Sequence, residues 1–273
     1  MQAAEKQASP ENAGFRDSIY RGAIVHLPAT PASLALCAAV NTVIETSLTG
    51  HDPRRAHETL DYTALSALVL PLRDSLAHTN DFHTLLKALM SSAGFDAAEH
   101  AIDPLRLRSV MHNGHLSKGS EKAYSLHRDT WYGNPQAQIN WWIPLQDVTP
   151  VETFAFYPEV FSTPIENSSH DFDYAQLVGK AGWQGTKGGT YANYPAAPEG
   201  LVTPAAGFAA KKGDIILFSA AQLHGTCRND SGRTRWSLDF RSVHIGDHAA
   251  GKGANNVDNG SAPSAFDSYL RLA

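Results

Sequence analysis

Two histidines and an aspartate, set far apart along the chain, most restrict what this sequence can fold into. His127 and Asp129 stand two residues apart, and His224 follows much later. Residues i and i+2 of an extended strand face the same side, so the first pair can converge on one ion. His224 can join them only in a fold that brings distant segments to the same place. We therefore expect a metal site formed by His127, Asp129 and His224.

The composition excludes several classes of protein. The chain has 273 residues, of which 42% are hydrophobic and 18% charged, so we expect a sizeable core. A formal net charge of −5 does not favour nucleic-acid binding, which normally needs a clustered basic surface. Two cysteines, Cys37 and Cys227, fit a reducing cytoplasm better than a disulfide framework. The polar N-terminus predicts no signal peptide, and the apolar runs are shorter than the roughly 18 residues of a membrane span. We expect a cytoplasmic protein that does not bind a membrane.

The first third of the chain has the pattern of helices. Between residues 33 and 94, apolar residues recur near helical spacing in three segments, and Gly94 fits the residue that ends the third. Ahead of them, residues 1–14 are polar and small, which predicts a flexible tail. We expect residues 15–104 to form a mainly helical part that covers the core.

After Pro104 the pattern changes to that of strands. Aromatic and β-branched residues predict strands at residues 105–112, 124–127, 136–145, 153–157, 215–218 and 234–243. Residues 158–204 are rich in Gly, Pro, Ser and Asn, which predicts an irregular insert with a short helix near residues 174–178. Helices first and strands later indicate an α+β fold.

These elements predict one domain over residues 1–273. We expect residues 105–245 to form a double-stranded β-helix, a jelly-roll or cupin-type barrel, with the N-terminal helices packed on one face. Residues 246–273 predict a polar tail that ends in a short segment at 266–272. Such a barrel brings distant strands to one mouth, which is how His224 can meet His127.

Two stretches of the chain carry a resemblance to a known family. They are LHRDTWYGNPQAQINWWIPLQDVTP and KKGDIILFSAAQLHGTCRNDSGRTRWSLDFR. Both resemble the iron(II)/2-oxoglutarate-dependent dioxygenases, particularly the phytanoyl-CoA dioxygenase-like branch. In that family a strand with a tryptophan follows the His-x-Asp, Gly-Asp-apolar-Phe precedes the second histidine, and Arg-x-Ser follows it. The resemblance covers residues 105–243, with one poorly matching middle section that usually shapes substrate selectivity.

The resemblance implies a cofactor and two cosubstrates. His127, Asp129 and His224 would hold Fe(II), and 2-oxoglutarate and O2 would react there. Arg235, eleven residues after His224, would bind the C5 carboxylate of 2-oxoglutarate, with Ser237 hydrogen-bonded to the same group. A guanidinium suits that role because it binds a carboxylate bidentately. Arg233 has the same strand parity and is the rival for this role.

Residues near the predicted ligands have expected roles as well. Gln138, Asn140 and Trp142 share one face of the strand at 136–145, where either amide could contact the cosubstrate and Trp142 could wall the substrate space. Trp131 and Tyr132 follow the His-x-Asp and are predicted to contact substrate at the mouth, although packing alone would explain them equally well.

We therefore expect a dioxygenase that hydroxylates a small-molecule substrate and releases succinate and CO2. Related halogenases have a small residue where Asp129 stands, so the carboxylate favours hydroxylation. One alternative is a non-catalytic, cupin-like sensor or binding protein with structural Zn or Ni. Another is a metal-dependent isomerase or hydrolase, which usually lacks the Arg-x-Ser. Neither the identity of the substrate nor the oligomeric state follows from the sequence.

Overall fold

The structure is a computed structural model that describes residues 13–118, 120–181, 194–198, 200–203, 205–261 and 265–272. Its strands form two antiparallel sheets, one of six strands in the order β1-β5-β3-β7-β2-β8 and one that pairs β4 with β6. The strands are β1 (Val25–Leu27), β2 (His100–Val110), β3 (Gln138–Pro144), β4 (Phe154–Phe156), β5 (Ile215–Ser219), β6 (His224–Thr226), β7 (Arg235–His244) and β8 (Leu270–Arg271). Within the described residues the two sheets do not join into a closed barrel. The mixed helix-and-sheet fold is confirmed, and the double-stranded β-helix stays a prediction.

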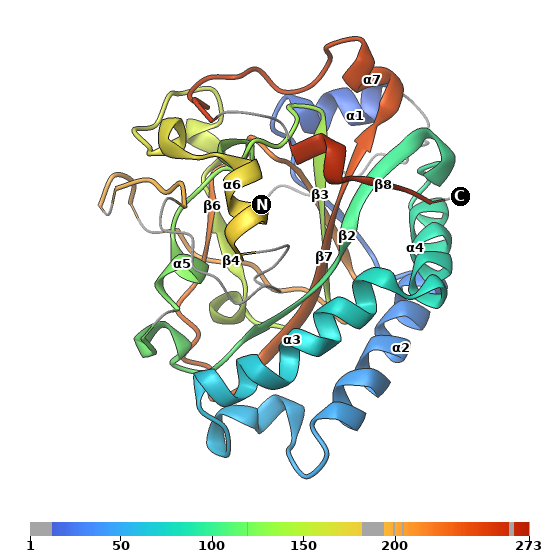
Figure 1. Cartoon of the computed structure of the whole chain (residues 1–273), viewed down its shortest axis with the longest axis vertical. Coiled ribbons are helices and arrows are strands. Elements are labelled where there is room, and N and C mark those ends of the chain that lie inside the picture. Colours follow the sequence, from blue (N-terminus) through green and yellow to red (C-terminus); the bar gives the residue numbers. More distant parts are fainter. Residues whose placement is uncertain are drawn as a thin grey trace.

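The helices gather on one side of the large sheet. Figure 1 shows α2, α3 and α4 on that side and β4 and β6 on the other. The α-helices are α1 (Ala13–Tyr20), α2 (Pro31–Ser47), α3 (Tyr62–His78), α4 (Asn80–Ser92), α5 (Glu121–Tyr124), α6 (Tyr174–Ala181) and α7 (Ile245–Ala249). Short 3-10 helices lie at Pro53–Glu58, Ala97–Glu99, Gly114–Leu116, Asp129–Tyr132, Pro150–Glu152, Pro158–Val160, Ser169–Asp171 and Ala265–Ser268. None of the helices described has the length and hydropathy of a membrane span.

Local signals in the sequence explain where the long helices begin and end. Thr30 and Ser33 form a capping box at the start of α2, and the Asp61 carboxylate caps α3 by accepting from Ala64 N–H. After α4, Gly94 has φ 77°, the left-handed conformation in which glycine costs least. The three predicted helical segments are therefore confirmed, and so is the role of Gly94.

One face of the six-stranded sheet packs against these helices; we call it the helix-covered face. Its side chains are buried and apolar: Leu107, Ile139, Trp141, Ile143, Ile215, Leu217, Trp236, Leu238 and Phe240. Trp141 stacks on Phe240 with ring centroids 5.0 Å apart. Trp141 thus belongs to the core, and this face holds the largest apolar cluster of the described residues.

The alternate residues of the same strands form the opposite face, which we call the site face. It carries Asp103, Arg106, Arg108, Gln138, Asn140, Trp142, Ile216, Phe218, Arg235, Ser237, Asp239 and Arg241. The register sets Asn140 opposite both Arg241 of β7 and Phe218 of β5. Directly opposite residues in antiparallel strands point to the same side. The site face is thus charged toward β2 and β7 and aromatic toward β3 and β5.

Several expectations need correction at their boundaries. The strand predicted at 105–112 begins at His100 and ends at Val110, and β1 was not predicted because three residues carry little periodicity. The predicted C-terminal tail contributes α7 and β8, and β8 pairs with β2. Of the predicted N-terminal tail, residues 1–12 lie outside the described part, and Ala13 begins α1. The predicted insert contains α6, which confirms its short helix.

Candidate metal centre

An extended residue between His127 and Asp129 places their side chains on the same side. Arg128 has φ −106° and ψ 141°, which sends its own side chain the other way. The strand predicted at 124–127 is wrong, because Tyr124 ends α5 and His127 makes only an isolated bridge. The two-residue spacing therefore acts through one extended residue and does not need a strand.

Arg128 anchors this segment in the interior. Its side chain is fully buried, and its Nε donates to Asp258 Oδ2 at 3.0 Å. The rest of the guanidinium donates to the main-chain carbonyls of Val160, Phe161, Thr163 and Ala221. A buried arginine with its donors bonded in this way rigidifies the backbone around it. The middle residue of the His-x-Asp motif thus fixes the segment that carries both predicted ligands.

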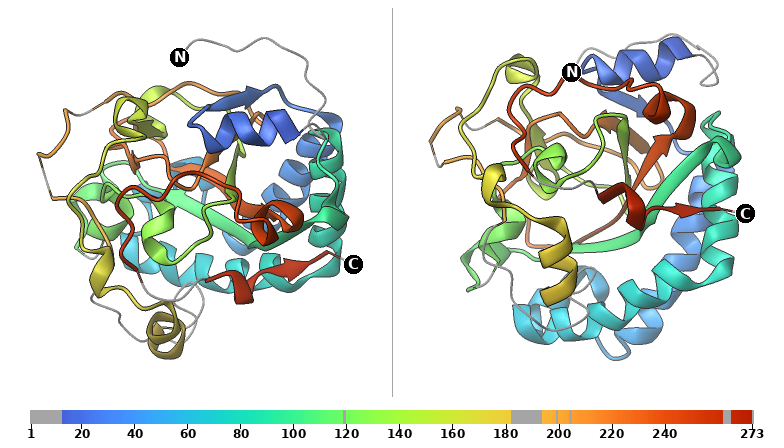
Figure 2. Two further views of the ribbon diagram at one scale, coloured as in Figure 1. Left: turned by 90° about the horizontal axis from the view of Figure 1, so that it is seen from above. Right: turned by 45° about the horizontal axis from the view of Figure 1, so that its top comes forward.

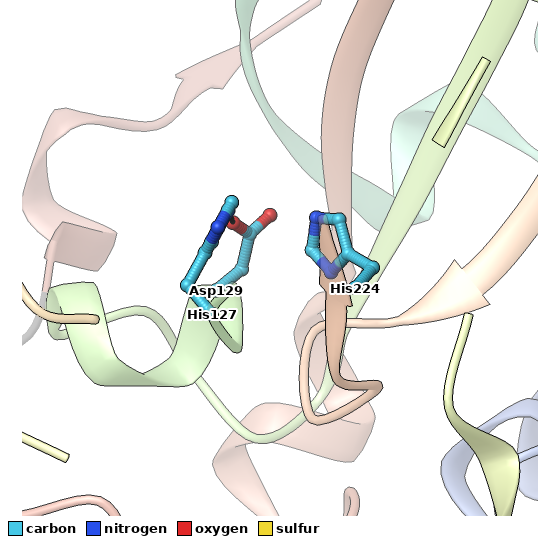
Figure 3. A group of neighbouring side chains, drawn as sticks. All are labelled: His127, Asp129 and His224. Carbon is cyan, nitrogen blue, oxygen red and sulfur yellow. Dashed lines mark ion pairs between the residues drawn. The ribbon is translucent and has the colours of Figure 1, made fainter. Parts of the chain in front are cut away.

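His224 comes from the smaller sheet as the first residue of β6. Its N–H donates to His127 O, and its carbonyl accepts from His127 N–H, each at 3.0 Å. The two ring centroids are 4.5 Å apart. Ligand atoms of His127, Asp129 and His224 lie within 4.8 Å of one another, and Figure 3 shows the two segments turning these side chains toward each other. The structure brings together all three residues that the sequence predicts as metal ligands.

Each imidazole has one nitrogen engaged by the backbone. His127 Nδ1 lies 2.9 Å from Ser125 O, and His224 Nδ1 lies 2.9 Å from Gln222 O. A carbonyl only accepts, so each Nδ1 carries the proton and each Nε2 keeps its lone pair. Burial and the neighbouring His127 lower the pKa of His224 to about 4, so this ring is neutral at physiological pH. Both rings are oriented as metal-binding histidines usually are.

Asp129 has one oxygen held by the protein and one turned toward the histidines. Its Oδ2 accepts from Asn140 Nδ2 at 2.9 Å, Arg241 Nε at 3.1 Å and Gln138 Nε2 at 3.4 Å. Its Oδ1 lies 3.5 Å from His127 Nε2. Burial by itself raises the pKa of Asp129, but the adjacent His127 and His224 and the Arg106 cation bring it below its ordinary value. The carboxylate is therefore ionised and available through Oδ1.

The amides of β3 support Asp129 in this structure. The sequence predicts a cosubstrate contact for Gln138 or Asn140, whereas both side chains donate to the aspartate. Gln138 Nε2 also donates to Asn140 Oδ1 at 2.6 Å. A contact between either amide and a cosubstrate stays a prediction. The supporting arginine, Arg241, was missed, although its parity with Arg235 on β7 was a usable signal.

Arg235 lies buried on the site face near one end of β7. Its Nε donates to Glu152 O at 2.9 Å, and its Nη1 donates to Ser237 Oγ at 2.5 Å. Burial is the main cause that lowers the pKa of Arg235 to about 10, and the nearby Arg108 cation is the second. Among the described residues, no carboxylate accepts a hydrogen bond from this guanidinium. Arg235 is therefore a buried cation able to bind an anion.

Two aromatic rings connect Arg235 with the predicted ligands. The guanidinium carbon lies 5.8 Å from the centre of the Trp142 ring. Trp142 contacts Phe154 at 5.3 Å between centroids, and Phe154 contacts His224 at 5.9 Å. Trp142 is only 4% exposed. It therefore lines the interior between Arg235 and His224, where the sequence predicts a wall of the substrate space.

Arg233, the rival of Arg235, has a different environment. Its side chain is 45% exposed, and it pairs with Glu152 Oε2 at 3.1 Å. This glutamate also pairs with Arg54 at 2.9 Å. Arg233 is thus part of an ion-pair group at the surface. The burial of Arg235 favours Arg235 as the residue that would bind the cosubstrate carboxylate.

The two aromatic residues after the His-x-Asp occupy different places. Trp131 is fully buried, and its Nε1 donates to Asp258 Oδ1 at 2.7 Å. This position differs from the expected one at the mouth, because the indole N–H has found an interior carboxylate. Tyr132 lies beside His127, with ring centroids 5.3 Å apart, and its hydroxyl donates to Pro195 O at 3.0 Å. Tyr132 remains close enough to the predicted ligands for a contact with substrate.

Comparison with known proteins found similar solved structures. No protein family profile and no curated protein matches the chain. EvdO2 from Micromonospora carbonacea var. aurantiaca, complexed with 2-oxoglutarate, has 13% identity and a TM-score of 0.47, and the match covers 90% of this chain and 97% of that one. The epimerase SnoN, in complex with Fe3+, α-ketoglutarate and nogalamycin RO, has 15% identity and a TM-score of 0.43, with coverages of 96% and 100%. ThoJ, a non-haem monooxygenase, has 12% identity and a TM-score of 0.44, with coverages of 84% and 77%.

Proposed function

We propose that this chain is an Fe(II)- and 2-oxoglutarate-dependent dioxygenase that hydroxylates an unactivated C–H bond of a small molecule. The observation that carries the proposal is the convergence of His127, Asp129 and His224, with each Nδ1 bonded to a carbonyl. We further propose that the two sheets are the halves of a double-stranded β-helix within one domain. His127 and His224 would then come from two segments that are hydrogen-bonded to each other at the mouth of this barrel.

The donor set fits iron. Two neutral imidazoles and one carboxylate are the ligands of the non-haem Fe(II) facial triad. No fourth His, Cys, Asp or Glu joins this cluster in the part of the chain that the structure describes. Coordination positions would therefore stay open for exogenous ligands. When bound, Fe(II) together with O2 and 2-oxoglutarate supplies the oxidising chemistry, with release of succinate and CO2.

Arg235 and Ser237 would bind the distal carboxylate of 2-oxoglutarate. The guanidinium is buried, is bonded to Ser237 Oγ and has no carboxylate as hydrogen-bond acceptor among the described residues. A buried cation gains most from an anionic partner that arrives with the ligand. Trp142 and Phe154 lie between this cation and His224 and would exclude water from the same space. Tyr132, beside His127, would contact the substrate.

Turnover of 2-oxoglutarate tests the proposal against its main alternative. The purified protein is incubated with Fe(II), 2-oxoglutarate and O2, and succinate is measured across a panel of amino acids, acyl-CoAs and secondary metabolites. We expect succinate release that depends on iron, together with a product heavier by one oxygen for the right substrate. If metal binds and no succinate forms under any condition, the result favours a non-catalytic metal-binding protein over a dioxygenase. A product without added oxygen would retain the cosubstrate chemistry and reject hydroxylation.

Alanine variants test the three ligands separately. His127→Ala, Asp129→Ala and His224→Ala should each abolish iron-dependent turnover, because a facial triad has no spare protein ligand. Each should unfold in thermal denaturation as cooperatively as the wild type. Metal affinity is measured by anaerobic Fe(II) titration. A variant with normal iron affinity and turnover would remove that residue from the ligand set.

A further inference from the structure

The C-terminal segment reaches the proposed metal centre through Tyr269. This residue precedes β8, which pairs with Ala101 and Ile102 of β2 at the edge of the six-stranded sheet. Figure 2 shows this segment crossing the molecule beside the sheet, close to its C-terminal end. The Tyr269 hydroxyl donates to Gln138 Oε1 at 2.5 Å. The residue just before β8 thus places its side chain in the group that supports Asp129.

The hydrogen bonds from Tyr269 onward form a directed chain. Because Gln138 Oε1 accepts from the tyrosine, its Nε2 is left to donate to Asn140 Oδ1 at 2.6 Å. Asn140 Oδ1 therefore accepts, and its Nδ2 donates to Asp129 Oδ2 at 2.9 Å. An amide is almost symmetric in shape, so only its partners decide which end is the donor. The hydroxyl at one end and the carboxylate at the other set both amides in one orientation.

The environment of Tyr269 keeps it a donor. Burial is the main cause that raises the pKa of Tyr269 well above its ordinary value, and the nearby Asp103 carboxylate raises it further. Its hydroxyl also lies 3.4 Å from Asn134 Oδ1, a second acceptor. The hydroxyl proton therefore points to Gln138 Oε1, the nearer of two acceptors, and neither oxygen has a proton to offer.

The consequence lies at Asp129. Three donors, from Asn140, Arg241 and Gln138, meet Oδ2, while Oδ1 lies 3.5 Å from His127 Nε2. If an amide reversed, an oxygen would face the carboxylate, and the repulsion would turn Asp129 away. We propose that Tyr269 is a positioning residue that holds Asp129 in the orientation for binding metal through one oxygen. This inference rests on the proposed metal site.

Co(II) titration of Tyr269→Phe tests the inference, since this change removes one hydroxyl and keeps the ring. We expect Co(II) affinity to fall about tenfold or more, as is typical for groups that orient a metal ligand. The visible absorption of bound Co(II) should change as well. Tyr20→Phe is the matched control, because Tyr20 is buried and its hydroxyl bonds Asp247 at 3.2 Å, outside the site. It should lose stability without any change in Co(II) affinity or spectrum.

A double variant tests whether Tyr269 acts through Gln138. Gln138→Met cuts the same chain in the middle and serves also if Tyr269→Phe does not fold. The pair Tyr269→Phe/Gln138→Met should bind Co(II) no more weakly than Gln138→Met alone. Additive losses would overturn the relay, and so would a Tyr269→Phe protein with wild-type affinity and spectrum. If the wild type itself binds no Co(II), or if Asp129→Ala binds it normally, the proposed metal site is wrong and the inference falls with it.

Discussion

The two faces of the six-stranded sheet are built from alternate residues of the same strands, yet they differ in kind. On β7, Trp236, Leu238 and Phe240 lie fully buried on the helix-covered face, while their neighbours Arg235 and Arg241 lie on the site face. The first set excludes water; the second brings charge into the interior. Burial of charge normally costs stability unless each ion is paired. The helix-covered face therefore provides apolar burial, whereas the site face carries the charged residues of the proposed binding site.

Pairing of charges on the site face is nearly complete. Asp103 accepts from both Arg106 and Arg241, and Asp239 accepts from Arg108. Arg241 also reaches Asp129. Arg235 differs, because no carboxylate of the described residues accepts a hydrogen bond from it. The exception supports the proposal that an anion from outside binds at Arg235.

The largest expected effect on stability is on the helix-covered face. Phe240→Ala should destabilise the fold by about 3–5 kcal/mol, because it removes a fully buried ring stacked on Trp141. Chemical denaturation measures the loss. Under native conditions, Co(II) affinity per folded molecule should stay at the wild-type level. A large change in metal affinity would show that the two faces are not separable.

On the site face, Arg235→Ala should instead weaken the binding of 2-oxoglutarate. Loss of a buried cation from a carboxylate pair costs roughly 3–5 kcal/mol, a factor of about 150 to several thousand in 2-oxoglutarate affinity. Iron binding should persist. Anaerobic titration followed by the charge-transfer absorption of the Fe(II) chelate measures both quantities. Ser237→Ala should cost less, about 1.5–3 kcal/mol, as one hydrogen bond to a charged group. Unchanged 2-oxoglutarate affinity in Arg235→Ala would reject this anchor.

Arg241→Gln should weaken Co(II) binding roughly 10- to 100-fold, because Asp129 Oδ2 loses a guanidinium partner. Arg106→Gln is the matched control, because Arg106 pairs with the same Asp103 and acts on Asp129 through its charge. Calorimetric titration compares the two. Equal losses in both variants would mean that general charge, rather than the contact with Asp129, sets the affinity.

The smallest effect is expected for Arg233→Ala. Its partner Glu152 keeps Arg54, and a pair in which one member is largely exposed contributes about 0–1 kcal/mol. Affinity for 2-oxoglutarate should stay within about twofold of the wild type, less than the tenfold that 1.4 kcal/mol represents. The titration used for Arg235→Ala measures it. A collapse of cosubstrate binding here would move the anchor from Arg235 to Arg233.

Sequence alone predicted the helix-covered face well and the site face only in part. Helical spacing and alternation suffice for α2, α3, β3 and β7, because burial of one apolar side determines them. The convergence of His127, Asp129 and His224 also followed from chemistry and spacing. The partners of Asp129 did not, because Arg241 reaches it from a strand whose register no local pattern contains. Tyr269, which bonds Gln138 from the residue before β8, was missed for a similar reason. Trp131 was misplaced for the same reason: its acceptor, Asp258, lies in a segment of low periodicity.

The bridge between His127 and His224 has a consequence for how the protein is made. Two backbone hydrogen bonds close the long stretch of chain between these residues. Loop-closure entropy rises only slowly with length, and formation of the sheets can offset it before any ion arrives. During synthesis, His127 and Asp129 leave the ribosome well before His224, so the nascent chain at first holds two of the three proposed ligands. A chain stalled between them would carry a weak two-ligand site, and full affinity would appear only when β6 has joined β4.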